Sequence, residues 1–173
     1  MKRRAKQRRF LMKKKGWNYF VCKRFFPAEH PYYPAFSGLD RREIVSVDCV
    51  LFPYLEWKAY KENDGLSPDE QALAVVMLTE KEMPPSPEGF VFCGFDIAGG
   101  GEFQDNAGIS ALVDCGADAF PEVFTNEDLN RYGLIDDLEK AWRIKELLPE
   151  KYPDEPHACC EVYAICRKTA ALN

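Results

Sequence analysis

Apolar and polar residues alternate with a period of two in several short runs along this chain. Such alternation is typical of β-strands, whose successive side chains point to opposite faces of a sheet. In the run Phe90–Ile97 both sets of alternating positions are mostly apolar, which favours a strand covered on both sides. The pattern predicts strands over Trp17–Phe26, Ile44–Phe52, Phe90–Ile97, Ile109–Cys115 and Cys159–Arg167.

A different pattern predicts a helix over residues 68–81. Ser67 is a good N-cap, Pro68 suits the first helical position, and Glu70 completes a capping box. The same stretch contains Leu-Ala-Val-Val-Met-Leu, whose β-branched residues are compatible with a strand instead. The helix is the prediction, and the strand remains the alternative.

Helical spacing returns near the end of the chain. Thr125 is placed to cap a short helix that Gly133 ends, and apolar residues then recur every three or four positions from Asp136 to Leu148, with Pro149 predicted to end that helix. Strands and helices together predict an α+β fold. We expect one domain with an antiparallel or mixed sheet and two or three helices packed on it.

The centre of the chain, Gly89–Gly116, is predicted to be a hairpin around a loop rich in glycine and carboxylates. Three successive glycines in this loop permit backbone conformations that other residues resist. Its acids are Asp96, Glu102 and Asp105. The loop is either a surface for a ligand or partner, or a plain hairpin connection.

Charge divides the chain unevenly. Residues 1–15 carry nine basic side chains and no acid, so the remaining 158 residues hold 14 basic against 28 acidic side chains. Residues 1–15 are predicted to be a disordered leader, or else the true start of the protein is Met12. Residues 16–173 are predicted to form a single acidic domain. A basic tail spanning Lys2–Lys15 is also compatible with binding nucleic acid or an anionic surface.

The acidic body excludes one class of function and favours another. Phosphate contacts require Lys and Arg, so binding of duplex nucleic acid through this surface is not expected. A negative field instead attracts a cationic partner and accelerates association with it. Solubility alone is the alternative explanation of the charge.

Candidate catalytic chemistry is sparse. The seven cysteines lack paired CxxC spacing and are expected to be reduced and mostly packed in the core. No cofactor motif is present, and His157 with Cys159 and Cys160 has no second ligand pair, so no metal site is predicted. An enzyme remains an alternative function, with Cys93 or Cys115 as a nucleophile or with the loop carboxylates as acid and base.

Three segments resemble a pattern in small uncharacterised bacterial proteins, some of which are immunity proteins of polymorphic toxin systems. The segments are FCGFDIAGGG…GISALVDCG, LNRYGLIDDLEKA and HACCEVYAICR, within Phe90–Arg167. The chain departs from the pattern by Asp114 in place of asparagine and by the inserted GGGEFQDN. The resemblance implies a binding protein inside the cell that occludes a toxin and has no catalysis of its own.

The sequence therefore predicts an acidic cytoplasmic binding protein, immunity-like, that docks a basic protein and needs no cofactor. No apolar run is long enough to span a membrane and no signal peptide is recognised, so no membrane partner is expected. An enzyme at the central hairpin and a nucleic-acid accessory protein acting through the basic tail are the alternatives. The predicted contact residues are Asp96, Glu102, Asp105, Asp136 and Asp137.

Overall fold

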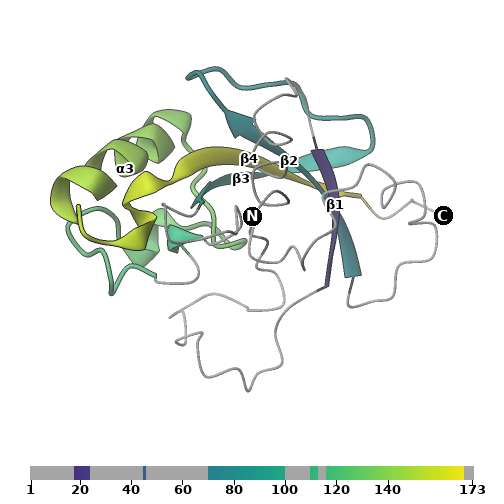
Figure 1. Ribbon diagram of the computed structural model, residues 1–173. Coiled ribbons are helices and arrows are strands. Elements are labelled where there is room, and N and C mark those ends of the chain that lie inside the picture. Colours follow the sequence, from purple (N-terminus) through teal and green to yellow (C-terminus); the bar gives the residue numbers. More distant parts are fainter. Residues whose placement is uncertain (1–17, 24–44, 46–69, 100–109, 113–115, 170–173) are drawn as a thin grey trace, which may run out of the picture.

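In the described residues of the computed structural model, a four-stranded antiparallel sheet has one α-helix packed against it (Figure 1). The structure describes residues 18–23, 45, 70–99, 110–112 and 116–169. The strands are β1 (Asn18–Lys23), β2 (Glu70–Leu78), β3 (Phe90–Ala98) and β4 (Glu161–Lys168), in the order β1-β2-β4-β3. The predicted α+β class is therefore confirmed, and the sheet is antiparallel throughout this order.

Strand β2 corrects the helix predicted over residues 68–81. The segment pairs with β1 along one edge and with β4 along the other, so it is an interior strand of the sheet. Leu73 and Val75 are buried on one face, and Val76 and Leu78 are buried on the other. A strand buried on both faces has a nearly continuous apolar run instead of an alternation, which explains why its pattern resembled a buried helix.

Strand β3 contains a β-bulge near its middle. Beyond the bulge, each side chain points to the face opposite to the one that strict alternation predicts. Phe92 pairs with Cys166 of β4 but Gly94 pairs with Ile165, so Cys93 is an extra residue without a partner in the register. Phe92 consequently shares a face with Phe95, and their rings meet edge to face with centroids 5.0 Å apart. The strand itself was predicted correctly, but the strict alternation on which that prediction rests would place Phe92 and Phe95 on opposite faces, which is wrong.

The α-helix α3 (Leu138–Lys151) packs on the sheet near its β3 edge, far from β1 (Figure 1). Its buried side chains are Ala141, Trp142, Ile144 and Leu148, as the helical spacing predicted. Pro149 does not end the helix, because the Tyr152 amide donates to the Leu148 carbonyl at 2.8 Å and Leu148 is anchored in the core.

Two short 3-10 helices accompany α3 in the described part of the chain: η5 (Asn126–Asp128) and η6 (Pro156–Cys159). The helix predicted to run from Thr125 to Gly133 is therefore limited to a single turn. Gly133 lies instead in the turn that follows, with a φ angle of 74°.

The second half of the predicted central hairpin is only partly described. Ser110 forms an isolated bridge with Ala98 of β3, whereas the long partner of β3 is β4. Within 110–112 the expected strand is therefore not formed. Of the strand expected over 44–52, only Val45 is described, and it is buried.

Candidate functional site

Asp96 is the first of the predicted contact acids, and the structure corrects it. Its side chain is 0% exposed and accepts a 2.6 Å hydrogen bond from the Ser110 hydroxyl, which is equally buried. The Ser110 oxygen in turn accepts the Leu112 amide at 3.1 Å. The reversal of faces at the bulge places Asp96 opposite Tyr163 on a covered face. Asp96 is therefore a buried acid bonded within the fold, and not the exposed acid that the sequence predicted.

Asp136 and Asp137 are exposed and stand immediately before α3. Glu102 and Asp105, the other two predicted contact acids, lie outside the described residues. The structure does not bring Asp96 and the acid pair to a common surface, because Asp96 is buried. The candidate site is accordingly the acid pair Asp136–Asp137. The turn between η5 and α3 determines the position of this pair.

That turn packs onto the edge of β3 at Gly94. The Phe95 amide donates to the Ile135 carbonyl at 2.7 Å and the Ile135 amide donates back at 2.9 Å, so the turn adds one bridge to the sheet edge. Gly94 has a φ angle of 141°, and a Cβ there would lie 2.7 Å from the Leu134 Cβ. Only glycine allows this close approach.

Asn130 organises the turn from within. Its amide Nδ2 donates to the Cys93 carbonyl at 2.7 Å and to Asp136 Oδ1 at 2.6 Å. Its Oδ1 accepts the amides of Tyr132 at 2.9 Å and Leu134 at 3.2 Å. One side chain thus joins the bulge of β3 to the turn and to the first acid of the pair, and the Asp136 carboxylate is held in place.

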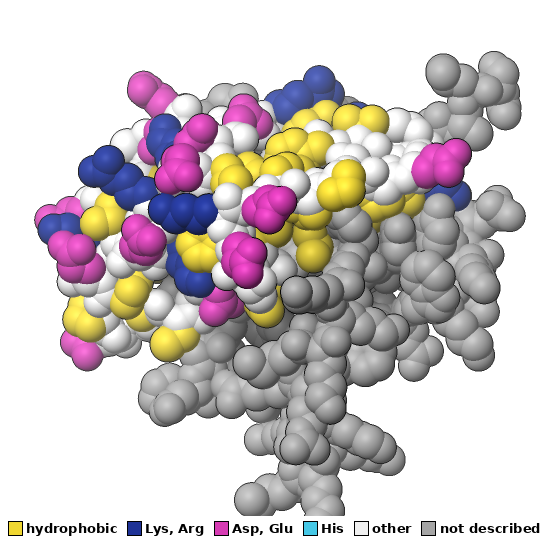
Figure 2. Space-filling model, turned by 90° about the horizontal axis from the view of Figure 1, so that it is seen from above, with side chains coloured by type: hydrophobic (Ala, Val, Ile, Leu, Met, Phe, Trp, Pro, Cys, Tyr) yellow, Lys and Arg dark blue, Asp and Glu magenta, His cyan; other side chains and the backbone are white. Residues whose placement is uncertain are grey.

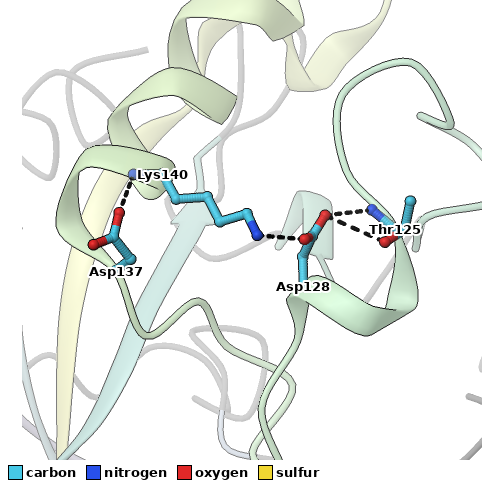
Figure 3. A network of polar contacts seen from close by, with 4 residues as sticks. All are labelled: Thr125, Asp128, Asp137 and Lys140. Atoms are coloured by element: carbon cyan, nitrogen blue, oxygen red, sulfur yellow. Dashed lines mark hydrogen bonds and ion pairs between the residues drawn. The ribbon is translucent and has the colours of Figure 1, made fainter.

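Asp137 is fixed by α3 itself. It is the N-cap of the helix, and its Oδ1 accepts the Lys140 amide at 2.7 Å (Figure 3). A carboxylate at this end of a helix is also stabilised by the helix dipole. The helix predicted from Asp136 to Leu148 already implied that both acids lie at its positive end, and the structure confirms that position, although the helix itself begins at Leu138.

The lysines near the acid pair are bound to other acids. The Lys140 ammonium pairs with Asp128 of η5, away from Asp137 (Figure 3), and Lys81 pairs with Glu139 at 3.3 Å. Within the part of the chain that the structure describes, neither Asp136 nor Asp137 forms an ion pair. Two exposed carboxylates are therefore held in place by hydrogen bonds from neutral groups.

Asp128 connects η5 to α3. Partial burial alone would raise its pKa, but hydrogen bonds from the Lys140 ammonium and the Thr125 amide dominate, and the pKa of Asp128 is lowered. The Thr125 amide donates to Asp128 Oδ2 at 2.8 Å (Figure 3). The ionised carboxylate thus fixes the position of η5 relative to the start of α3.

Cys93 does not have the features of an activated nucleophile. Burial raises the pKa of its thiol to about 11, although the positive charges of Arg167 and Arg131 act in the opposite direction. A thiol of this kind is almost entirely protonated at neutral pH. Cys115, the other candidate nucleophile, lies outside the described residues.

Neither a metal centre nor a membrane span emerges from the described residues. Among them, no group of three or more His, Cys, Asp and Glu side chains is placed to hold a metal ion. In the same part of the chain, no helix has the length and apolar character needed to cross a membrane.

Sequence reasoning missed Asn130 and Gly94, the two residues that position the turn. The segment Asn130–Gly133 does carry a turn signal, because asparagine and glycine favour tight turns. Nothing in the local sequence showed that this turn would pack against β3, which is more than 30 residues earlier in the chain and meets it through Phe95 and Ile135.

Comparison with known proteins finds no match to a family model, to a curated protein or to a solved structure. The function must therefore be argued from the chain's own residues.

Proposed function

We propose that this protein is an acidic cytoplasmic binding protein that docks a basic protein partner, in the way an immunity protein occludes its toxin. The observation that carries the proposal is the exposed pair Asp136–Asp137, which is held in place and forms no ion pair within the described part of the chain. The partner class that matches such a surface is a protein with Lys or Arg side chains at its contact surface.

The overall charge supports the same partner class. Residues 16–173 hold 28 acidic and 14 basic side chains, so their field is negative. Such a field raises the association rate with a cationic protein, and the gain falls as salt screens the charges. The acid pair adds fixed local charges to this long-range attraction.

The fixed geometry of the pair matters for affinity. Ordering a flexible side chain at an interface costs about 0.5–1.5 kcal/mol. Asp136 is already held by Asn130, and Asp137 is already held by the first turn of α3. A partner cation would therefore meet carboxylates whose positions are set before binding.

The two alternative functions gain less support. Burial raises the pKa of Cys93 to about 11, which disfavours it as a nucleophile. The basic tail and the loop acids Glu102 and Asp105 lie outside the described residues, so the contact assigned to them remains a hypothesis drawn from the sequence alone.

The proposal is tested by capture at low salt. The tagged protein is incubated with lysate of its native host, and the bound proteins are eluted with increasing salt and identified. We expect one basic protein to elute at moderate salt. The double variant Asp136→Asn/Asp137→Asn should release it at clearly lower salt, since asparagine retains the hydrogen-bonding roles but not the charge.

The matched control is Glu122→Gln/Glu146→Gln, which removes the same charge from two exposed positions elsewhere. Neither of these acids forms an ion pair within the described residues. If both double variants shift the elution equally, net charge and not the acid pair determines binding. Capture of no basic protein contradicts the proposed function.

A further inference from the structure

The connection from β2 to β3 contains a proline segment, Met83–Pro87, whose conformation is restricted by its covalent structure. Its sequence is Met-Pro-Pro-Ser-Pro. Each proline fixes its own φ angle, and each residue before a proline is driven out of the helical region. All five residues meet one of these conditions, so the polyproline II conformation is favoured throughout the segment.

The structure holds this segment at both ends. Lys81 pairs with Glu139 of α3 on one side, at 3.3 Å. On the other side the Phe90 amide donates to the Pro87 carbonyl at 3.1 Å, and both the amide and the hydroxyl of Thr169 donate to the Gly89 carbonyl at 3.0 Å. The segment between these anchors belongs to neither a helix nor a strand and passes over the sheet (Figure 1), where the Cys166 thiol of β4 donates to the Ser86 hydroxyl at 3.7 Å.

Parts of the proline segment contact the protein and other parts are exposed. Pro84 and Pro87, which would share one edge of a polyproline II helix, are half-buried. Pro85 and Ser86 are exposed, and Met83 is 38% exposed. In the described residues the only other large apolar side chain with comparable exposure is Val91, shortly after the segment.

Acidic side chains border this apolar segment. Glu80 and Glu82 precede it, Glu88 follows it, and all three are exposed. The one cation of the connection, Lys81, is paired with Glu139. Figure 2 shows apolar side chains gathered along the middle of the face over which the connection passes, with acidic side chains beside them.

We propose that the proline segment is a docking element for a partner domain whose groove is lined by aromatic side chains and bordered by Lys or Arg. Aromatic grooves bind polyproline II segments because the conformation is already set and little ordering entropy is lost. Met83 and Pro85 would enter the groove, and Glu82 and Glu88 would meet its basic rim. This surface goes beyond the acid pair and does not depend on it.

The test uses the full chain and a purified WW domain, a module with an aromatic polyproline-binding groove. The domain is prepared in three versions, with lysine, neutral or glutamate residues at the groove rim. Titration calorimetry should show saturable binding, with the lysine version binding roughly tenfold tighter than the glutamate version because of charge complementarity. Met83→Ala/Pro85→Ala should weaken binding of the lysine version about fivefold or more.

Two control variants separate this surface from others. Pro121→Ala/Pro153→Ala removes two exposed prolines elsewhere and should bind as the wild type does. Asp136→Asn/Asp137→Asn should also bind unchanged, which distinguishes this surface from the acid pair. The proposal is overturned by a lack of saturable binding to all three versions, by no preference for the lysine rim, or by equal weakening in the proline control. Circular dichroism confirms that each variant is folded.

Discussion

Gly94 and Leu134 approach so closely that a Cβ at position 94 would lie 2.7 Å from the Leu134 Cβ. The contact joins β3 to the turn that carries Asp136. It is possible because Gly94, which follows the bulge at Cys93, has no side chain and adopts a positive φ angle. The position of the acid pair therefore depends on a glycine more than 40 residues earlier in the chain.

Gly94→Ala is expected to destabilise the protein strongly. The added methyl group must displace Leu134 or the Ile135 carbonyl, and alanine is strained at a φ angle of 141°. We expect a loss of about 3 kcal/mol in the free energy of unfolding, measured by urea denaturation. Gly89→Ala is the control: its φ angle is 78° but its Cβ would meet nothing within 4 Å. That variant should lose only about 1 kcal/mol. Equal losses would show that steric contact with the turn is unimportant.

Asp128→Asn is expected to destabilise the protein in a pH-dependent way. The pKa of Asp128 is lowered from its ordinary value of 3.8 in the folded protein, so its stabilising effect is complete above that value and is lost as the pH falls through the folded pKa. At pH 7 the variant should be less stable by about 1 kcal/mol. The difference should shrink as the pH falls below 3.8 and should disappear once the pH is below the folded pKa. Denaturant unfolding at several pH values measures it, and a difference independent of pH would contradict the assigned role.

The bulge in β3 shows where sequence patterns stop being sufficient. Alternation correctly predicted the strand, but a single extra residue, Cys93, moved Phe95 to the face of Phe92 and Asp96 to the opposite, covered face. Bulges depend on pairing with a distant strand, here β4, and local patterns do not specify that pairing. Asp96 was expected to be exposed because it was assigned to the loop, whereas it lies within β3 and is buried against Ser110.

Other elements were predicted as far as local signals reach. The buried face of α3 follows from residues within one or two turns of each other and is confirmed, but the helix begins at Leu138 with Asp137 as its cap and not at Asp136 as predicted. The segment that forms β2 was predicted to be a helix because it begins with a capping signal that is followed by an apolar run. Neither signal gives information about the two strands that pair with the segment. Pairing with β1 and β4 decides its structure.

Trp142→Phe is expected to change stability by less than about 1 kcal/mol. The indole Nε1 of Trp142 is buried and finds no hydrogen-bond acceptor among the described residues, so its removal relieves an unsatisfied donor while most of the aromatic packing is retained. Trp142→Ala should by comparison cost about 3–5 kcal/mol. Thermal unfolding of both variants measures the difference. A cost for the phenylalanine variant close to that of alanine would show that the indole N–H makes an essential bond.

Cys159 should react with iodoacetamide much faster than Cys93 in the folded protein. Cys159 is exposed, whereas Cys93 is buried and the pKa of its thiol is raised to about 11, so little thiolate forms at pH 8. Peptide mass spectrometry after brief labelling gives both rates. Rapid, selective labelling of Cys93 would contradict this environment and would favour the enzyme alternative.

The association rate with the captured basic protein, measured by stopped flow at several salt concentrations, tests the proposed function most directly. For the wild type we expect the rate to fall steeply as salt is raised, because complementary charges accelerate encounter. For Asp136→Asn/Asp137→Asn the rate at low salt should be lower and its salt dependence weaker than for Glu122→Gln/Glu146→Gln. A wild-type rate that does not change with salt, or identical behaviour of the two double variants, would contradict docking through the acid pair.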